Sequence, residues 1–221
     1  PVRCEEREAL IRWRLGKEQL FPLSGAKVLS QVFYDRSRGK GPAHTVLTVA
    51  VEESVLKQYE SLCESVGVIP QEVGVTSLQI FDLWRRVSSG SHWRSRNCLW
   101  VNVSDRALTT MIYQQGRLLS YRCKLLGAEV TEASRKTDML NKTLEECCVS
   151  LEICQQQHPS AVVKEAVICA DGDIAAFRKL IETELHLSVE QLGWESVEAL
   201  GRMATESDRG RTSLAPVAAV L

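Results

Sequence analysis

Two polar segments, each at the end of a predicted buried strand, are the places where this sequence could hold a ligand. The first is Leu99–Asp105 (LWVNVSD), which offers Asn102, Ser104 and Asp105 at a strand exit. Backbone N–H groups at such an exit can bind an anion. Every strand of an α/β protein leaves polar residues at its exit, so a purely structural role is the favoured interpretation of this segment by itself.

The second segment is Cys169–Asp173 (CADGD), which leads from a strand directly into a helix. Gly172 permits a sharp turn, and Asp171 or Asp173 is expected to cap the helix. A helix start of this kind can also bind a nucleotide or another anion. Two carboxylates at that position repel phosphate, so a simple helix cap is the favoured interpretation.

The thiols and imidazoles form no pattern that indicates catalysis or metal binding. None of the eight cysteines belongs to a CxxC pair, and the four histidines show no HxxxH or HExxH spacing. A metal site could be built from Cys147, Cys148, Cys154 and His158, but their spacing matches no standard zinc pattern. The sequence also lacks GxSxG, P-loop, GxGxxG and paired-carboxylate motifs. We therefore expect reduced thiols, no metal site and no catalytic residue.

A small basic and aromatic patch is predicted between positions 84 and 96. It consists of Arg85, Arg86, Arg94 and Arg96 beside Trp84 and Trp93. Such a patch could bind RNA or an acidic partner peptide, but a solvated loop between two lobes is the favoured interpretation. The formal net charge of −1 gives no overall attraction to nucleic acid or anionic lipid.

Periodicity predicts the elements that must position these residues. Helical spacing of apolar residues predicts helices over 5–20, 55–66, 77–87, 129–156 and 174–185. Runs rich in β-branched residues predict strands over 28–34, 45–51, 98–103, 108–113, 118–126, 165–169 and 188–192. We expect Gly67 to end the second helix and Gly116 to form a hairpin turn.

This order of elements fits a three-layer α/β arrangement in two lobes. The 221 residues suffice for one large domain or two small ones. The polar segment 88–97 (SSGSHWRSRN) is the best internal boundary. No apolar run reaches the roughly 18 residues of a membrane span, and no signal-peptide pattern is present.

Taken in order, these segments resemble the PilM family of type IV pilus assembly proteins, relatives of the division protein FtsA in the actin-like superfamily. The similarity runs from EALIRW (8–13) and LFPL (20–23) through the strand, helix and turn of 46–70. It continues in the strand and hairpin of 99–127, in 167–189, and in the closing LAPVAAVL (214–221).

The resemblance implies an actin-like (ribonuclease H-like) mixed-sheet lobe plus a small α+β inserted subdomain. Residues 1–75 would form this subdomain and the end of the first lobe, 76–97 a connecting helix and inter-lobe loop, and 98–221 the second lobe. The opening strands of the first lobe, which carry the family's first phosphate loop, would be missing at the amino terminus. The two strand exits, centred on 102 and 171, would face each other across a cleft.

The sequence departs from the family at the implied nucleotide site, which comprises Asn102, Ser104, Asp105, Asp171 and Gly172. Asn102 replaces the aspartate that handles metal and water, and Ser104 replaces a glycine that approaches phosphate. Ala170 and Asp171 replace glycines of the adenosine turn. A neutral asparagine is a poor partner for hydrated Mg²⁺. We therefore expect no enzyme activity and no cofactor, with ATP and Mg²⁺ bound only if this degenerate site is active.

The resemblance further implies a cytoplasmic scaffold at the inner face of the cytoplasmic membrane. It would bind the cytoplasmic tail of a PilN-like inner-membrane protein against elements between Glu5 and Val66, through apolar anchors and main-chain hydrogen bonds. Two alternatives remain open. One is a nucleotide-binding actin-like ATPase that uses Asn102, Ser104 and Gly172, and the other is a cytoplasmic domain of the GspL kind from type II secretion.

Overall fold

The computed structural model describes residues 4–17, 22–35, 43–70, 73–88, 90–104, 107–126, 132–170 and 174–193. The chain divides into two compact units, Pro1–Val73 and Gly74–Leu221. This division lies earlier than the boundary expected at 88–97. The reason is that the helix after Val73 packs onto the sheet of the second unit through Leu83 and Trp84, so it does not act as a free connection.

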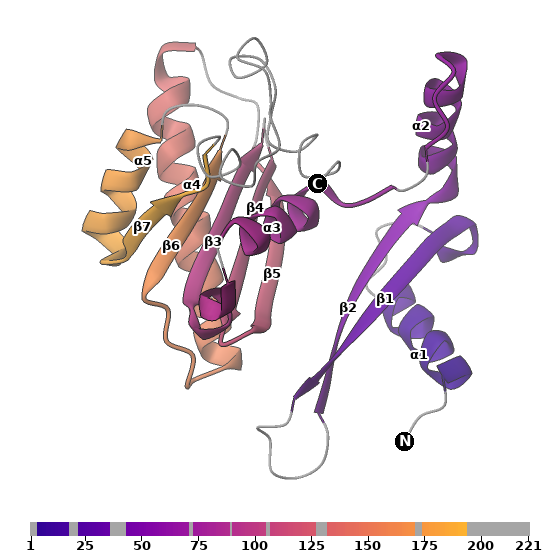
Figure 1. Cartoon of the computed structure of the whole chain (residues 1–221), viewed down its shortest axis with the longest axis horizontal. Helices are drawn as coiled ribbons and strands as arrows, with labels where there is room; N and C mark the ends of the chain where they lie inside the picture. The colour runs from indigo at the N-terminus through magenta and orange to yellow at the C-terminus, as the bar shows by residue number, and fades with distance from the viewer. Residues whose placement is uncertain are drawn as a thin grey trace. The chain divides into compact units, whose positions relative to one another are not determined.

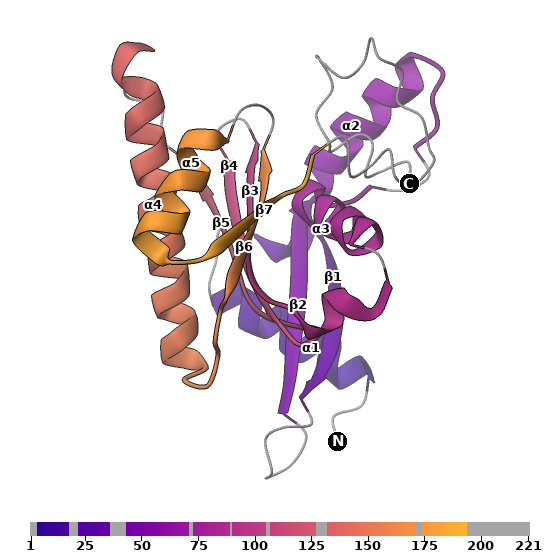
Figure 2. The same cartoon turned by 60° about the vertical axis from the view of Figure 1, so that its left-hand side comes forward.

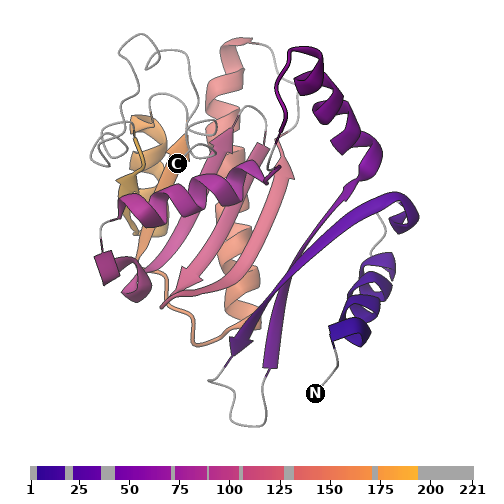
Figure 3. The same ribbon diagram turned by 45° about the vertical axis from the view of Figure 1, so that its right-hand side comes forward.

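The first unit is built on a two-stranded antiparallel hairpin. α1 (Cys4–Lys17) and a short 3-10 turn precede β1 (Ala26–Asp35), which pairs with β2 (Ala43–Glu52). Their register runs without interruption from Ala26 opposite Glu52 to Asp35 opposite Ala43. α2 (Glu53–Ser65) begins directly where β2 ends, as Figure 3 shows.

The end of α2 confirms the helix stop predicted at Gly67. Gly67 has a φ of 76°, its N–H donates to the Glu64 carbonyl, and the Val68 N–H donates to the Cys63 carbonyl, both at 2.9 Å. This is the Schellman arrangement, which satisfies carbonyls at the helix end that have no partner within the helix. Glycine adopts this left-handed conformation without a steric penalty.

A five-stranded mixed sheet forms the centre of the second unit, with the strand order β5-β4-β3-β6-β7. The strands are β3 (Asn97–Ser104), β4 (Ala107–Gln114), β5 (Arg117–Leu125), β6 (Glu165–Ala170) and β7 (Ser188–Gln191). β4 runs antiparallel to both β3 and β5, whereas β6 runs parallel to both β3 and β7.

Helices cover both faces of this sheet, which confirms the predicted three-layer arrangement for the second unit (Figures 1 and 2). α3 (Thr76–Val87) lies on one face. On the other face lie α4 (Glu132–Gln157) and α5 (Ala175–Leu180), which continues as the π-helix η3 (Ile181–Leu185). The 3-10 helix η2 (Gly90–Ser95) connects α3 to β3.

Alternation along β3 explains why its sequence is apolar at nearly every position. Leu99 and Val101 belong to the core under α4 and α5, whereas Cys98 and Trp100 belong to the core under α3. A strand that is buried on both faces loses the apolar–polar alternation of a half-exposed strand. The central strand therefore connects two apolar cores.

The β4–β5 hairpin confirms the predicted turn. Gln115 and Gly116 have φ values of 48° and 81°. Positive φ at both central residues is the mark of the type I′ turn, whose twist matches that of the flanking strands.

α4 is the longest of the described helices, with 26 residues. None of the helices within the described ranges, α4 included, combines the length and the apolar composition needed to cross a bilayer.

Candidate functional site

The two strand exits singled out in the sequence are neighbours at one edge of the sheet. In the parallel pairing of β3 with β6, Asn102 lies opposite Cys169 and Val103 opposite Ala170. The exits therefore lie side by side on adjacent strands, which differs from the expectation that they face each other across a cleft. Ligands of α/β proteins bind at such carboxyl-terminal strand edges. Of the expected site residues, Asn102 and Ser104 are described, and Asp105, Asp171 and Gly172 lie outside the described residues.

The described register partners of Asn102 are uncharged. Its side chain is only 5% exposed, and its partners in register are Thr109 on β4 and Cys169 on β6. Residues opposite each other on neighbouring strands point to the same face, so the amide lies beside a hydroxyl and a thiol. These groups form hydrogen bonds but carry no negative charge for Mg²⁺, which prefers carboxylate oxygens.

The start of α5 corrects one prediction. The N-cap is Ile174, not Asp171 or Asp173, and it makes no side-chain capping hydrogen bond. An isoleucine side chain has no acceptor for the first N–H groups of a helix. Because α5 itself has only 6 residues, it also supplies little helix dipole for an anion.

The patch of arginines and tryptophans is packed within the second unit, in contrast to the solvated loop that was expected. Trp84 is fully buried and packs with Phe81 and Tyr113. Trp93 stacks on Tyr113, and the guanidinium of Arg85 lies 4.3 Å from the centre of the Trp93 ring. Aromatic stacking and cation–π contacts of this kind stabilise folded structure. Most of the patch is therefore structural.

Arg96 anchors the same region through carboxylates at the beginning of β6 and in β7. Its guanidinium donates two hydrogen bonds of 2.7 Å to Glu165 and lies 2.8 Å from an oxygen of Glu190. The hydrogen bond to Glu165, against the opposing effect of burial, raises the pKa of Arg96 above its already high ordinary value. Glu190 also accepts a hydrogen bond from Trp84 Nε1 at 3.2 Å.

No disulfide joins the cysteines that the structure describes from Cys63 to Cys169. Burial raises the pKa of Cys98 and of Cys147 to about 12, so both stay protonated at neutral pH. Cys147 and Cys169 are buried, whereas Cys63 is only partly buried. Within the described ranges, no group of three or more His, Cys, Asp or Glu side chains is placed to hold a metal ion.

A second candidate site lies in the first unit, where the apolar stripe of α2 is largely uncovered. The α2 face, as we name it, consists of the exposed side chains Val55, Tyr59, Leu62 and Val66. Val68 and Ile69 after the helix are exposed too, and Ile69 is 82% exposed. Exposed apolar side chains that gather on one side of an element mark interaction surfaces. Periodicity located this stripe, but only the structure shows that the described residues leave it exposed.

The hairpin of the first unit adds a further binding feature. β1 and β2 pair only with each other among the described residues, so each has an unpaired edge. Among the residues of this unit whose burial the structure describes, Ala26 alone is buried. A two-stranded hairpin without a substantial core is marginally stable in water, and an open strand edge can pair with an extended peptide.

Comparison with known proteins yields matches among solved structures only. No protein-family model and no curated protein matches the chain. Among solved structures, one described as the "PilM-PilN type IV pilus biogenesis complex" matches with a TM-score of 0.66 and 14% sequence identity. The match covers 96% of this chain and 69% of that chain. The chain has the fold of PilM.

Two other solved structures match less well. A protein from Bacteroides thetaiotaomicron, described as having an actin-like ATPase fold and unknown function, matches with a TM-score of 0.42 and 11% identity, over 90% of this chain and 65% of that one. An exopolyphosphatase from Cytophaga hutchinsonii matches with a TM-score of 0.27 and 12% identity, over 89% and 86%. The PilM fold and the mixed sheet confirm the resemblance and the α/β fold class predicted from the sequence.

Proposed function

We propose that this chain is a scaffold of type IV pilus or related secretion assembly, whose first unit binds the cytoplasmic tail of a PilN-like inner-membrane protein. The observation that carries the proposal is the PilM fold over 96% of the chain, shared with a structure described as a PilM-PilN complex. The chain would then work in the cytoplasm, held at the inner face of the membrane through its partner.

The chemistry of the first unit supports binding of an apolar, extended peptide. The α2 face offers Tyr59 and Leu62, which are 62% and 64% exposed, as anchors. The open strand edges of the hairpin offer main-chain hydrogen bonds. Glu53, Glu60 and Glu64 on α2, with Lys57 as its single basic residue, favour a peptide that carries a positive charge.

We also infer that the chain does not hydrolyse ATP. Support comes from the strand exit at Asn102, where a buried amide lies beside Thr109 and Cys169. A hydrolytic site needs a carboxylate or its equivalent to hold Mg²⁺ and to orient water. The side chains that surround Asn102 in register lack that charge.

The test is peptide binding by the intact chain. A fluorescent peptide with the tail sequence of the candidate partner is titrated, and its anisotropy is measured. Leu62→Glu is compared with Leu125→Glu, because both leucines are exposed, at 64% and 79%, and lie in different units. We expect Leu62→Glu to weaken binding at least about ten-fold, which is 1.4 kcal/mol, and Leu125→Glu to bind as the wild type does.

Two results would overturn the proposal. One is the absence of binding by the wild-type chain at high micromolar peptide. The other is an equal loss of affinity in both variants, which would show that the added charge acts nonspecifically.

A further inference from the structure

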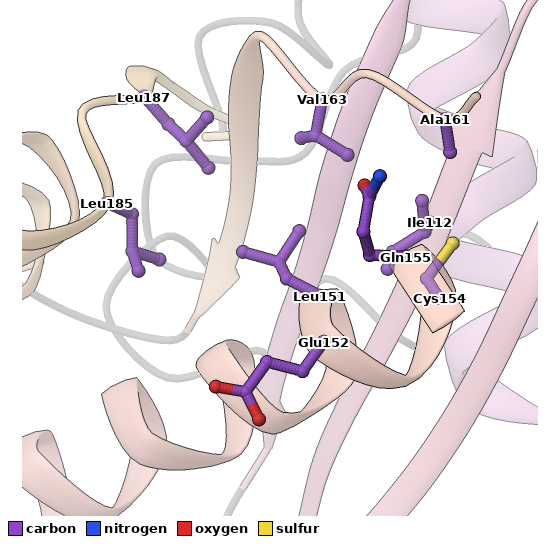
Figure 4. A pocket seen from close by; sticks show the side chains of 9 residues that line it. All are labelled: Ile112, Leu151, Glu152, Cys154, Gln155, Ala161, Val163, Leu185 and Leu187. Carbon is purple, nitrogen blue, oxygen red and sulfur yellow. The ribbon is translucent and has the colours of Figure 1, made fainter. Parts of the chain in front are cut away.

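A groove in the second unit is separate from both the strand exits and the α2 face. It has a volume of about 330 Å³ and lies between the second half of α4 and the segments at 161–163 and 185–187 (Figure 4). Leu151 and Cys154 line it from α4, and Val163, Leu185 and Leu187 line it from the other side. We name it the α4 groove.

The sheet register places the α4 groove away from the candidate nucleotide edge. Ile112, which lines the groove, pairs with Leu99 near the beginning of β3, and Leu99 pairs with Ala166 near the beginning of β6. Asn102 and Ala170 lie toward the other ends of these strands. A ligand in the α4 groove therefore would not occupy the strand exits.

Small side chains and an unusual backbone keep the groove open. Ala161 and Cys154 line it and are nearly fully buried, so a larger residue at either position would fill the space. The π-helix η3 ends at His186, whose φ is 54°, between the lining residues Leu185 and Leu187. A left-handed conformation is uncommon for a residue other than glycine, and π-turns occur often at functional sites.

The wall of the groove is apolar and its rim is acidic. Glu152 is the one carboxylate among the described lining residues, and none of these residues is basic. Burial, and then the negative charges of Glu152, Glu145 and Glu184, raise the pKa of the Cys148 thiol on α4, so two further carboxylates contribute negative potential near Glu152. Such a concentration of one sign attracts a cation.

A polar side chain at the rim is already held in place. Gln155 Nε2 donates a hydrogen bond of 2.7 Å to the Pro159 carbonyl, which fixes this amide beside the groove. A side chain that is already ordered lowers the entropic cost of binding.

We propose that the α4 groove is a docking site for a second partner protein, which inserts one apolar side chain and places a lysine or arginine against Glu152. The volume is at the lower end of the roughly 300–1,000 Å³ typical of ligand pockets, which suits one large side chain better than an extended ligand. The apolar wall takes the anchor, and the acidic rim selects the neighbouring charge. This inference is independent of the tail-binding proposal, because it concerns residues of the second unit only.

The test uses three acetylated and amidated peptides, SRLRS, SELES and SRSRS, which differ only in charge or in the anchor. Their binding is followed by NMR through methyl groups of Leu151, Leu185 and Leu187 in the whole chain. One buried leucine and one charge-assisted hydrogen bond predict a Kd of about 1 mM for SRLRS. We expect the other two peptides to bind at least about ten-fold more weakly.

A pair of charge reversals tests the role of Glu152. Glu152→Lys should make SELES bind better than SRLRS, whereas Glu60→Lys on exposed α2 should preserve the wild-type preference; both glutamates are exposed, so both variants should fold. The proposal is overturned if SRLRS and SELES bind equally, or if these methyl signals do not move at about ten times the expected Kd. A dilution-dependent shift without peptide would assign the groove to a second copy of the chain and overturn it too.

Discussion

Arg96 and Glu165 stand 69 residues apart in the sequence and form two parallel hydrogen bonds, each of 2.7 Å. The pair joins the segment before β3 to the first residue of β6. The guanidinium also lies 5.2 Å from the centre of the Trp84 ring. This one side chain therefore links α3, the central strand and its parallel neighbour.

Replacing Arg96 by alanine should destabilise the second unit. The side chains of Arg96 and Glu165 are only 18% and 24% exposed, and the change leaves Glu165 near Glu190 without a cation between them. We expect a loss of about 2–3 kcal/mol in the free energy of unfolding, measured in urea. Arg86→Ala is the control, because its pair with Asp82 is more exposed and should contribute at most about 1 kcal/mol. Equal losses would contradict this account of the pair.

The packing of α3 predicts a large effect at Leu83. Its side chain is 1% exposed in the core that also contains Trp84 and Trp100. Leu83→Ala should cost about 2–5 kcal/mol, because it removes buried apolar atoms and leaves a cavity. Leu125→Ala, at a side chain 79% exposed, should change stability by less than about 0.5 kcal/mol. The measurement is urea unfolding followed by tryptophan fluorescence. An unchanged unfolding transition in Leu83→Ala would instead support the original prediction that 76–97 is a connecting segment.

The β4–β5 turn should not tolerate a side chain at Gly116. An added Cβ would meet its nearest neighbour, Tyr113 Oη, at an ordinary 3.6 Å, so the cost arises from the φ of 81°. Gly116→Ala should lower the free energy of unfolding by about 1–2 kcal/mol. Gly193→Ala has open space around the new Cβ and should lie within about 0.5 kcal/mol of the wild type. The reverse order of the two variants would disprove the turn assignment.

Stability should fall at alkaline pH because of buried thiols. Burial raises the pKa of Cys98 to about 12, whereas the same thiol in the unfolded chain ionises from about pH 8.5. Between these values the unfolded state binds fewer protons, so the free energy of unfolding decreases as pH rises, by up to about 1.4 kcal/mol per pH unit for each thiol. Stability is full below pH 8 and the loss is complete near pH 12.

Variants assign this pH dependence to particular thiols. Cys98→Ala should flatten the slope of unfolding free energy against pH between 9 and 11, measured in urea under reducing conditions. Cys147→Ala should flatten it by a similar amount, since burial raises that pKa to about 12 as well. Slopes identical to that of the wild type in both variants would show that other groups cause the loss.

Nucleotide should leave the thermal stability of the chain unchanged. We expect the melting midpoint with ATP and Mg²⁺ to equal that with Mg²⁺ alone, because the buried amide of Asn102 has Thr109 and Cys169 as its register neighbours. A ligand at one hundred times its Kd would stabilise the folded state by about 2.7 kcal/mol, which a melting curve resolves easily. A nucleotide-dependent rise of that size would favour the ATPase alternative.

Local periodicity predicted the elements well, because one-sided burial imposes a period of 3.6 on helices and of 2 on strands. The described helices and strands begin and end within about four residues of their expected bounds, and Gly67 and Gly116 lie in the conformations predicted for them. The expected start of α4 at 129 and the closing segment 214–221 lie outside the described residues.

Side-chain partners were harder to predict, because they depend on contacts between distant segments. The segment that contains the arginines near Trp84 and Trp93 has the composition of a solvated loop. In the structure, however, Arg96 pairs with the carboxylates of Glu165 on β6 and Glu190 on β7. The residues near Arg96 in the sequence do not predict this pairing, because its partners lie on distant strands. The N-cap of α5 also differs from the prediction, because Ile174 occupies the position that Asp171 or Asp173 was expected to fill.

By itself, the sequence determined the order of helices and strands, the two turns made by glycine, and the resemblance to PilM, since these depend on neighbours along the chain. The tertiary structure decided that Asn102 lies beside Cys169 and that α3 packs onto the sheet of the second unit. It also decided that the described residues leave the α2 face and the α4 groove exposed. The physical reason is that a residue's type sets how strongly it favours burial, whereas the packing of distant segments determines whether anything covers it.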